Sequence, residues 1–448
     1  MGMELVEDPR LGAFHRKLNI LSASGTFLDG YDLAVMGVAL PYLVKQFSLG
    51  PTMVGILASS VFIGNMLGMM VFGYLTDRIG RRVMYIIDLA TFVVFAGLTA
   101  VSVNIWELMI FRFLLGIGIG ADYAISPTLV AEFNPTKKRG GRVAFLSLTF
   151  FIGVSASYFI GLIANPLGPA AWRYMLGFGA LIAAVVLYFR RQIPESPRWL
   201  AARGKVKEAQ AVVQDLTGTS VSVAPAGSWS WRELFGKDLI GRTMFVCLFW
   251  FAWDVLYYGV TLYAPSILKV ASHGSFVDGV LGASSIGLVS ILGTIIGLVF
   301  LFDRWGRRPS IILGFAGLTV ALTVLALLGH PSFFELVFFL NAGVFVGNLG
   351  PGVLPFIYAS DLFPTDLRAA GTGVGATAGR IGGILGILVF PGLIAAWGIG
   401  HAIYLFVGAG LLGLVVSLIM APETKGKTLE EIENSARSSK KTQVTTVS

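Results

Sequence analysis

The sequence predicts an all-α polytopic membrane protein in which twelve transmembrane helices form two pseudo-symmetric six-helix bundles. Three observations support this fold class. The composition is 55% hydrophobic and only 13% charged, which is typical of membrane proteins rather than soluble domains. About twelve apolar stretches of about 20 residues recur, and each can cross a hydrocarbon core of about 30 Å. Short charged motifs between these stretches occur twice in the same order.

The predicted spans fall six before and six after a polar linker. The first six lie near residues 18–43, 52–75, 83–102, 106–131, 142–164 and 171–189, and the second six near residues 242–270, 277–301, 309–329, 333–360, 369–395 and 401–421. The implied domains are an N-terminal cytoplasmic segment (1–17), a first six-helix half (18–189), a cytoplasmic linker with short helices (190–241), a second six-helix half (242–421) and a cytoplasmic tail (422–448).

Topology explains the formal charge of +8 better than nucleic-acid binding does. Most of the 33 Lys and Arg residues fall on alternate loops and at the two ends, which by the positive-inside rule places both termini in the cytoplasm. Only Arg112 and Arg380 are expected within spans, while Arg190 is assigned to the cytoplasmic linker. The first span is too long for a cleavable signal, so we expect it to be retained. The single cysteine, Cys247, gives no metal-binding spacing, and we expect neither a metal nor a cofactor.

An internal repeat relates the two halves. Three motifs return in the same order and at nearly the same spacing. The matched segments are 77–82 and 303–308, 135–139 and 364–368, and 194–195 and 422–423. Two parallel repeats predict a binding site near the bilayer midplane between the halves, with alternating access by rocking of one half against the other.

Carboxylates inside the predicted spans are candidates for proton coupling. A charge at the bilayer centre costs about 2.5–3.5 kcal/mol even on a lenient scale, so Asp29 and Asp32 on the first span need partners. They share a helix face, and Gly30 between them lets another backbone approach. Burial favours the protonated carboxyl whereas a nearby Arg favours the charged one, so such a group can carry a proton. We expect Asp29, Asp32, Arg112 and Asp122 to couple protons, with a static buried ion pair as the alternative.

The motifs resemble those of the major facilitator superfamily over essentially the whole chain. Gly73 and residues 77–82 match its loop between helices 2 and 3, and residues 194–200 and 422–427 match the ends of its two halves. The resemblance implies the twelve-helix major facilitator fold and latches at a cytoplasmic gate. The gating candidates are Asp77, Arg78, Arg81, Arg139, Asp303, Arg304, Arg307 and Arg368, with Asp77–Arg139 and Asp303–Arg368 as the expected latch pairs and simple positive-inside anchoring as the alternative.

Two branches of the superfamily fit the predicted site, the phosphate:proton symporters and the sugar porters. Trp250, Asp254 and Tyr258 stand at i, i+4 and i+8 and are similar to the anion-site pattern of phosphate:proton symporters. The glycine run 116–120 leads into an Asp-Tyr pair, as in that branch. The resemblance implies a proton-coupled symporter of inorganic phosphate or another small anion. The expected substrate-binding residues are Tyr123, Trp250, Asp254, Tyr258 and Arg380.

Two departures from the phosphate pattern keep other substrates open. Phe150 and Gly352 stand where that branch places a Gln and an Asn, so two amide groups are missing from the expected cage. A larger, more apolar site suits a sugar acid, an aromatic carboxylate or a neutral sugar. In that case a resemblance to sugar porters implies a pair of Asp32 with Arg112 that protonation breaks, and Asp29 and Asp122 form a second coupling set.

Other classes of function have weaker support. No His, Cys or Ser constellation has a spacing suited to catalysis, so we expect a transporter and not an enzyme. A non-transporting nutrient sensor is the alternative from another class, but the tails are short. The expected partners are a small-molecule or ion substrate, protons and the lipid bilayer, without nucleic acid. We expect a monomer in the cell membrane.

Overall fold

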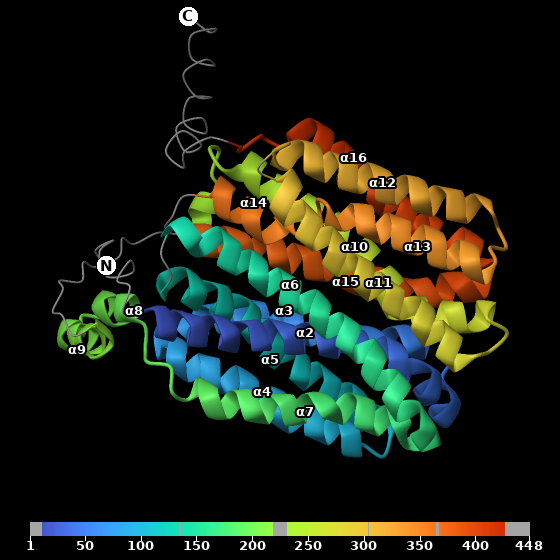
Figure 1. Cartoon of the computed structure of the whole chain (residues 1–448), viewed down its shortest axis with the longest axis horizontal. Helices are drawn as coiled ribbons and strands as arrows, with labels where there is room; N and C mark the ends of the chain where they lie inside the picture. The colour runs from blue at the N-terminus through green and yellow to red at the C-terminus, as the bar shows by residue number, and fades with distance from the viewer. Residues whose placement is uncertain (1–10, 134–135, 218–230, 303, 364–366, 426–448) are drawn as a thin grey trace, which may run out of the picture. The chain divides into compact units, whose positions relative to one another are not determined.

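The computed structural model describes residues 11–133, 136–217, 231–302, 304–363 and 367–425. Within these ranges the regular elements are helices that follow the predicted spans (Figure 1). Eight helical segments of the described residues are long and apolar enough to cross a membrane, and two further apolar helices are shorter.

The first six predicted spans each correspond to one helix. They are α2 (Gly12–Phe47), α3 (Pro51–Ile79), α4 (Arg81–Val101), α5 (Ile105–Phe133), α6 (Thr136–Ala164) and α7 (Ala171–Arg190). Two short helices follow in the linker, α8 (Pro197–Ala202) and α9 (Val206–Thr217). They pack on each other through a small core of Leu200, Ala201, Ala209 and Val213.

The second six spans correspond to seven helices. They are α10 (Ile240–Ala271), α11 (Phe276–Ile296), α12 (Arg307–Leu327), α13 (Phe333–Asn348), α14 (Leu354–Leu362), α15 (Arg368–Ala402) and α16 (Tyr404–Met420). The tenth span is broken between α13 and α14, where Gly350, Pro351 and Gly352 occur in succession. Glycine weakens a helix, and proline lacks the N–H group that a helix interior needs. Near the end of α15, Gly398 has a φ of 78°, which separates the last two spans.

The chain divides into two compact units. The first contains Met1–Gly227, Ala264–Val270 and Ser275–Gly287, and the second contains Ser228–Tyr263, Ala271–Gly274 and Leu288–Ser448. The predicted domain limits stay predictions.

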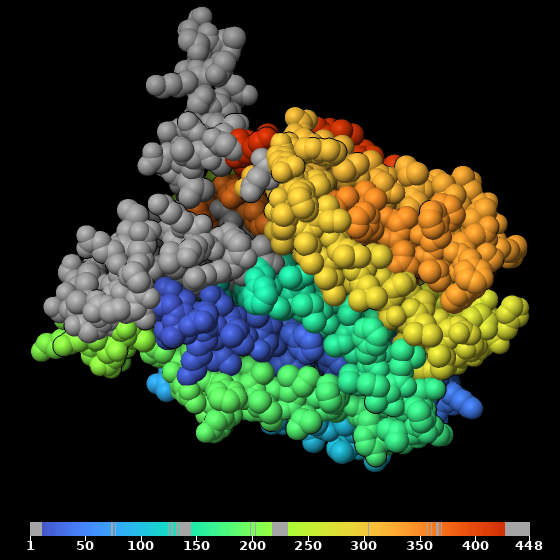
Figure 2. All heavy atoms as spheres, viewed as in Figure 1, coloured from blue at the N-terminus to red at the C-terminus, as the bar shows by residue number. Residues whose placement is uncertain are grey.

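Glycines allow close helix packing in the first unit. A Cβ on Gly30 of α2 would overlap the carbonyl oxygen of Phe150 on α6, and one on Gly153 would overlap that of Phe27. The predicted close approach at Gly30 is therefore confirmed, and its partner is α6. Figure 2 shows α2, α6 and α7, in blue, teal and green, packed side by side.

In the second unit, α10 packs closely on α15. A Cβ on Gly382 would overlap the carbonyl oxygen of Phe251, and one on Gly386 would lie 2.6 Å from that of Val255. This contact places the polar residues of α10 against those of α15.

Candidate functional site

One buried ion pair joins α2 to α5. Arg112 donates from Nη1 to Asp32 Oδ1 at 2.9 Å and from Nη2 to the Asp32 backbone carbonyl at 3.1 Å. The two side chains are 0% and 1% exposed. Removing one partner of such a pair leaves an uncompensated buried charge, which typically costs about 3–5 kcal/mol. The structure therefore contains the pair that the resemblance to sugar porters implied, while its role in coupling stays a prediction.

One oxygen of this pair is available to a proton. Asp32 Oδ2 is buried and has no hydrogen-bond partner in the structure. A proton there would neutralise Asp32 and leave the Arg112 charge unbalanced. Protonation of Asp32 would therefore remove one electrostatic attraction between α2 and α5.

A second cluster of buried charges centres on Arg190, the last residue of α7. Its Nη1 donates to Asp88 Oδ2 at 2.9 Å, and its Nη2 lies 2.9 Å from Asp122 Oδ1. The guanidinium also covers the Tyr85 ring, with Cζ 3.8 Å from the ring centroid. Arg190 is fully buried.

Arg190 corrects the expectation that only Arg112 and Arg380 are cations within spans. The pair Arg190–Arg191 follows an apolar stretch, so the sequence indicates a cytoplasmic anchor. In the structure Arg191 is exposed, but Arg190 is buried against α4 and α5. A long side chain at a helix end can turn back toward the protein interior, and sequence position alone does not reveal this.

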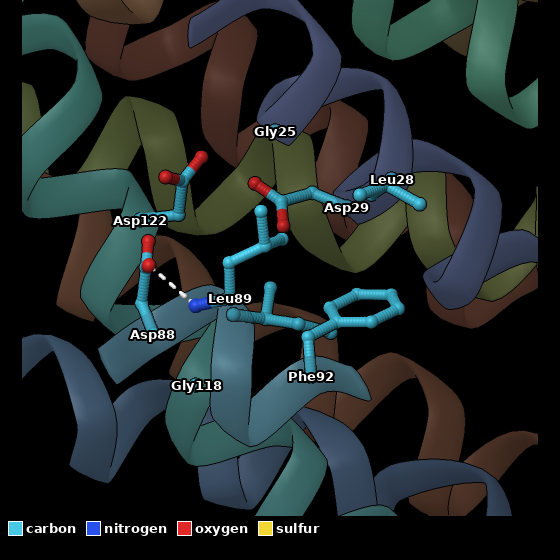
Figure 3. A pocket seen from close by; sticks show the side chains of 9 residues that line it. Gly25, Leu28, Asp29, Asp88, Leu89, Phe92, Gly118 and Asp122 are labelled. Atoms are coloured by element: carbon cyan, nitrogen blue, oxygen red, sulfur yellow. Dashed lines mark hydrogen bonds between the residues drawn. The ribbon is translucent and has the colours of Figure 1, made fainter. Parts of the chain in front are cut away.

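A small pocket adjoins the Arg190 cluster. Its volume is about 10 Å³, which is room for about one water molecule. Figure 3 shows the carboxylates of Asp29, Asp88 and Asp122 directed toward the same space, with Leu89 and Phe92 beside them. Three helices, α2, α4 and α5, thus bring one carboxylate each to this pocket.

In the second unit, α10 and α15 form an aromatic site around one ion pair. Trp250, Asp254 and Tyr258 belong to one continuous helix, so they share the face that their spacing predicted. Arg380 of α15 donates from Nη1 to Asp254 Oδ2 at 3.1 Å. Its Cζ lies 5.0 Å from the centroid of the Tyr258 ring. Gly379 permits this packing, because a Cβ there would lie 2.9 Å from both Trp250 Nε1 and Asp254 Oδ2.

More aromatic rings extend this surface along α10. Trp253 stacks on Tyr257 with centroids 5.3 Å apart and an interplanar angle of 18°. Tyr257 in turn meets Tyr258 edge to face at 5.3 Å. The second unit therefore offers an aromatic surface beside an ion pair whose two charges cancel.

Asn348 supplies an amide group next to Gly352, where the sequence suggested that one was missing. A Cβ on Gly352 would overlap Asn348 Oδ1 and lie 2.9 Å from Trp253 Cζ2. Asn348 Nδ2 donates to the Val344 carbonyl at 2.9 Å, while the buried Oδ1 has no hydrogen-bond partner. Asn348 is the last residue of α13, and its amide oxygen lies beside Gly352. Phe150 contributes its backbone carbonyl to the contact with α2 described above.

In the first unit, the Pro-Glu motif (residues 194–195) binds the start of α4. Glu195 accepts hydrogen bonds from the backbone N–H groups of Arg81 and Arg82 at 3.0 and 3.1 Å. These groups have no partner within the helix, and a carboxylate also complements the positive end of the helix dipole. Gly80, with a φ of 120°, leaves room for Glu195.

The second unit repeats this arrangement at the start of α12. Glu423 accepts from the backbone N–H groups of Arg307 and Arg308, again at 3.0 and 3.1 Å. Gly306 has a φ of 101°. In addition, Arg307 Nε lies 3.6 Å from Asp361 Oδ2. Motifs that the repeat matched in the sequence thus meet within each unit.

Some predicted gating residues lie outside the described residues. The side chains of Asp77 and Arg139 and the whole of Asp303 belong to this group, so both predicted latch pairs stay predictions. Among the other predicted site residues, Arg78 and Arg304 are exposed and Arg81, Tyr123, Arg307 and Arg368 are half-buried.

The comparisons with known proteins agree on one family. The family model described as "Sugar (and other) transporter" matches residues 18–436. YaaU of Escherichia coli (strain K12), named "Putative metabolite transport protein", is 32% identical over 430 residues, which cover 96% of each chain. The arabinose-proton symporter of Bacillus subtilis (strain 168) is 31% identical over 437 residues, which cover 91% of this chain and 92% of that relative.

A solved structure has the same fold. The xylose transporter XylE from E. coli, in a partially occluded inward open conformation, matches with a TM-score of 0.77 and 22% identity, over 93% of this chain and all of that chain. XylE is a protein of the major facilitator superfamily. The predicted twelve-helix major facilitator fold is thereby confirmed.

The comparisons do not support the phosphate:proton symporter branch, and they point to the sugar porters instead. The spacing of Trp250, Asp254 and Tyr258 shows only that these residues share a helix face, which both kinds of substrate can use. The length of the family match and the identity of the relatives decide the assignment: the chain is an integral multi-pass membrane transporter that belongs to the sugar (and other) transporter family.

Proposed function

We propose that the protein is a proton-coupled symporter of a neutral, polyhydroxylated solute, with a sugar as the first candidate. The observation that carries this proposal is the pairing of Arg380 with Asp254 inside an aromatic site. The arabinose-proton symporter among the relatives supports the same class of substrate.

The charge of the site argues against a free anion. A dianion such as phosphate needs excess positive charge, but the Asp254 carboxylate already balances Arg380 at 3.1 Å. An ionised Asp254 would also repel the anion. A neutral sugar meets no such penalty, because its hydroxyl groups both donate to a carboxylate and accept from a guanidinium.

The aromatic rings suit the apolar faces of a sugar ring. Trp250 and Tyr258 flank the ion pair, and the stacked Trp253 and Tyr257 continue the surface. Apolar walls with a few placed polar groups are the usual composition of a small-molecule site. Asn348 Oδ1 adds a buried acceptor beside Trp253.

Proton coupling is assigned to Asp32 and Arg112 of the first unit. With Asp32 ionised, the pair holds α2 to α5; with Asp32 protonated, that attraction is lost. Transport then proceeds by alternating access, as in other transporters built from parallel repeats.

A sugar acid is the second candidate, because protonation of Asp254 would release Arg380 toward a carboxylate. Binding titrations distinguish a neutral sugar from a sugar acid as the substrate. Purified protein in detergent is titrated with D-xylose, L-arabinose, D-glucose, D-gluconate and inorganic phosphate at several pH values, and the quenching of tryptophan fluorescence is followed. We expect a neutral sugar to bind with little pH dependence. Binding of gluconate or phosphate alone, tightening as the pH falls, would contradict the neutral-solute proposal.

A further inference from the structure

We propose that Arg190 is a positioning residue that links protonation of Asp88 and Asp122 to the cytoplasmic end of α4. The proposal rests on the proposed proton coupling, but both of its tests are performed without a transported substrate.

The charges around Arg190 do not balance when every carboxylate is ionised. Asp88 and Asp122 both contact its guanidinium, and Asp29 lines the same pocket. One guanidinium therefore contacts two carboxylates, both buried. Carboxylates that share a buried site do not all keep their charges, so the cluster favours taking up protons.

The remaining groups around the cluster are neutral. From α4, Tyr85 lies under the guanidinium and its hydroxyl is 3.1 Å from Ser22 Oγ of α2. From α5, Ser126 donates to Asp122 Oδ1 at 2.8 Å. Asp122 lines the pocket, and its Oδ2 atom is buried and has no hydrogen-bond partner. Among the described residues, the charged groups of α2, α4, α5 and α7 that face the pocket or contact Arg190 are thus three carboxylates and one guanidinium.

The backbone of α2 lies directly against this cluster. A Cβ on Gly25 would overlap both Arg190 Nη2 and Asp122 Oδ2. A change in the position of the Arg190 side chain therefore affects α2, the helix that also carries Asp32.

The segment from Arg190 to Glu195, which follows α7, contacts α4 at two points. Arg190 binds Asp88, and Glu195, five residues later in the sequence, binds the backbone of Arg81 and Arg82. Between them Ile193 is buried. The Glu195 contact caps the helix. The Arg190 contact has a charge-dependent part, the ion pair with Asp88, and a part that does not depend on that charge, a hydrogen bond to the Tyr85 backbone carbonyl at 3.3 Å. Protonation of Asp88 would weaken one of the two attachments and loosen the start of α4.

The first test measures carboxyl protonation by infrared difference spectroscopy during a pH titration of the full-length protein in nanodiscs. We expect Asp88→Asn and Asp122→Asn each to remove part of the protonated-carboxyl signal. The control Asp278→Asn, at an exposed carboxylate of α11, should leave that part unchanged. Arg190→Gln should make the signal persist to higher pH, and Arg190→Lys, which keeps the charge, should largely restore the normal titration.

A milder variant covers the case in which Arg190→Gln does not fold. Ser126→Ala removes only a hydrogen bond to Asp122 and should shift the signal in the same direction by a smaller amount. The proposal would be overturned if the infrared titration curve stayed the same as that of the wild type in all three variants, Asp88→Asn, Asp122→Asn and Ser126→Ala.

The second test measures hydrogen–deuterium exchange in the first turn of α4. At neutral pH, Asp88→Asn should speed exchange at residues 81–85, because the neutral side chain mimics the protonated state. The first turn of α12, which Glu423 caps in the second unit, is the internal control and should not change. Unaltered exchange at α4 would contradict the link, whereas a failure to transport sugars would leave both results standing.

Discussion

The two units carry the same helix cap but different charges in their interiors. Glu195 and Glu423 each accept two backbone hydrogen bonds at the start of a helix, at the same pair of distances. The first unit buries Asp32–Arg112 and the Arg190 cluster. The second buries Asp254–Arg380 among aromatic rings.

This difference indicates a division of roles. Caps that recur in both units serve a need that both share, the anchoring of a helix beside a charged loop. The charges that do not recur belong to functions that only one unit performs. A cluster in which carboxylates outnumber the guanidinium suits proton binding, and a balanced ion pair among several aromatic rings suits recognition of a neutral solute.

The largest effect is expected for Asp32→Asn. Asn cannot take up or release a proton. This variant should therefore lose substrate accumulation driven by a pH gradient but should still exchange substrate across the membrane. Uptake and counterflow in proteoliposomes measure the two activities, with Asp278→Asn as the control. Normal gradient-driven accumulation by Asp32→Asn would show that Asp32 of the first unit does not couple transport to protons.

Asp254→Asn should have the next largest effect. It leaves Arg380 without its balancing charge, so we expect stability to fall by about 3–5 kcal/mol and binding of D-gluconate or phosphate to improve relative to neutral sugars. Thermal unfolding and competition binding test these two outcomes. If the variant kept the wild-type preference between anionic and neutral ligands, the ion pair would not determine which substrate charge the site accepts.

The two caps should respond alike. Glu195→Ala and Glu423→Ala each remove hydrogen bonds at a helix start, and loss of such a cap costs about 0.5–2 kcal/mol. Turnover should fall more than affinity in both, as expected when a conformational step limits the rate. A large difference between the two variants would contradict the view that the repeated motif has one role.

Tyr258→Phe tests recognition with the smallest change. Loss of one hydroxyl to a neutral partner costs about 0.5–1.5 kcal/mol, which is roughly 2- to 13-fold in affinity. Tyr404→Phe, on an exposed ring of α16, is the control. A loss near a hundredfold, measured by the same fluorescence titration, would indicate a charged partner and favour the sugar acid.

The fold was predictable because hydropathy and repeated motifs act over long stretches of chain. The Asp32–Arg112 pair was also accessible, because the resemblance to sugar porters implied it. Arg190 was missed because its position beside Arg191 looks like a loop. The Asn348 amide was missed because the comparison with the phosphate pattern considered only the residue at position 352, whereas Asn348 lies beside it. Both errors concern the direction of a side chain, which depends on neighbouring helices rather than on local sequence.

The most direct test of the account is uptake of radiolabelled solutes into proteoliposomes under an imposed inward proton gradient. The panel contains D-xylose, L-arabinose, D-glucose and inorganic phosphate, each measured with the wild type and with Asp32→Asn. The account predicts that at least one neutral sugar accumulates only with the gradient, and that Asp32→Asn abolishes this accumulation. Gradient-driven accumulation of phosphate, with none of the sugars transported, would contradict it.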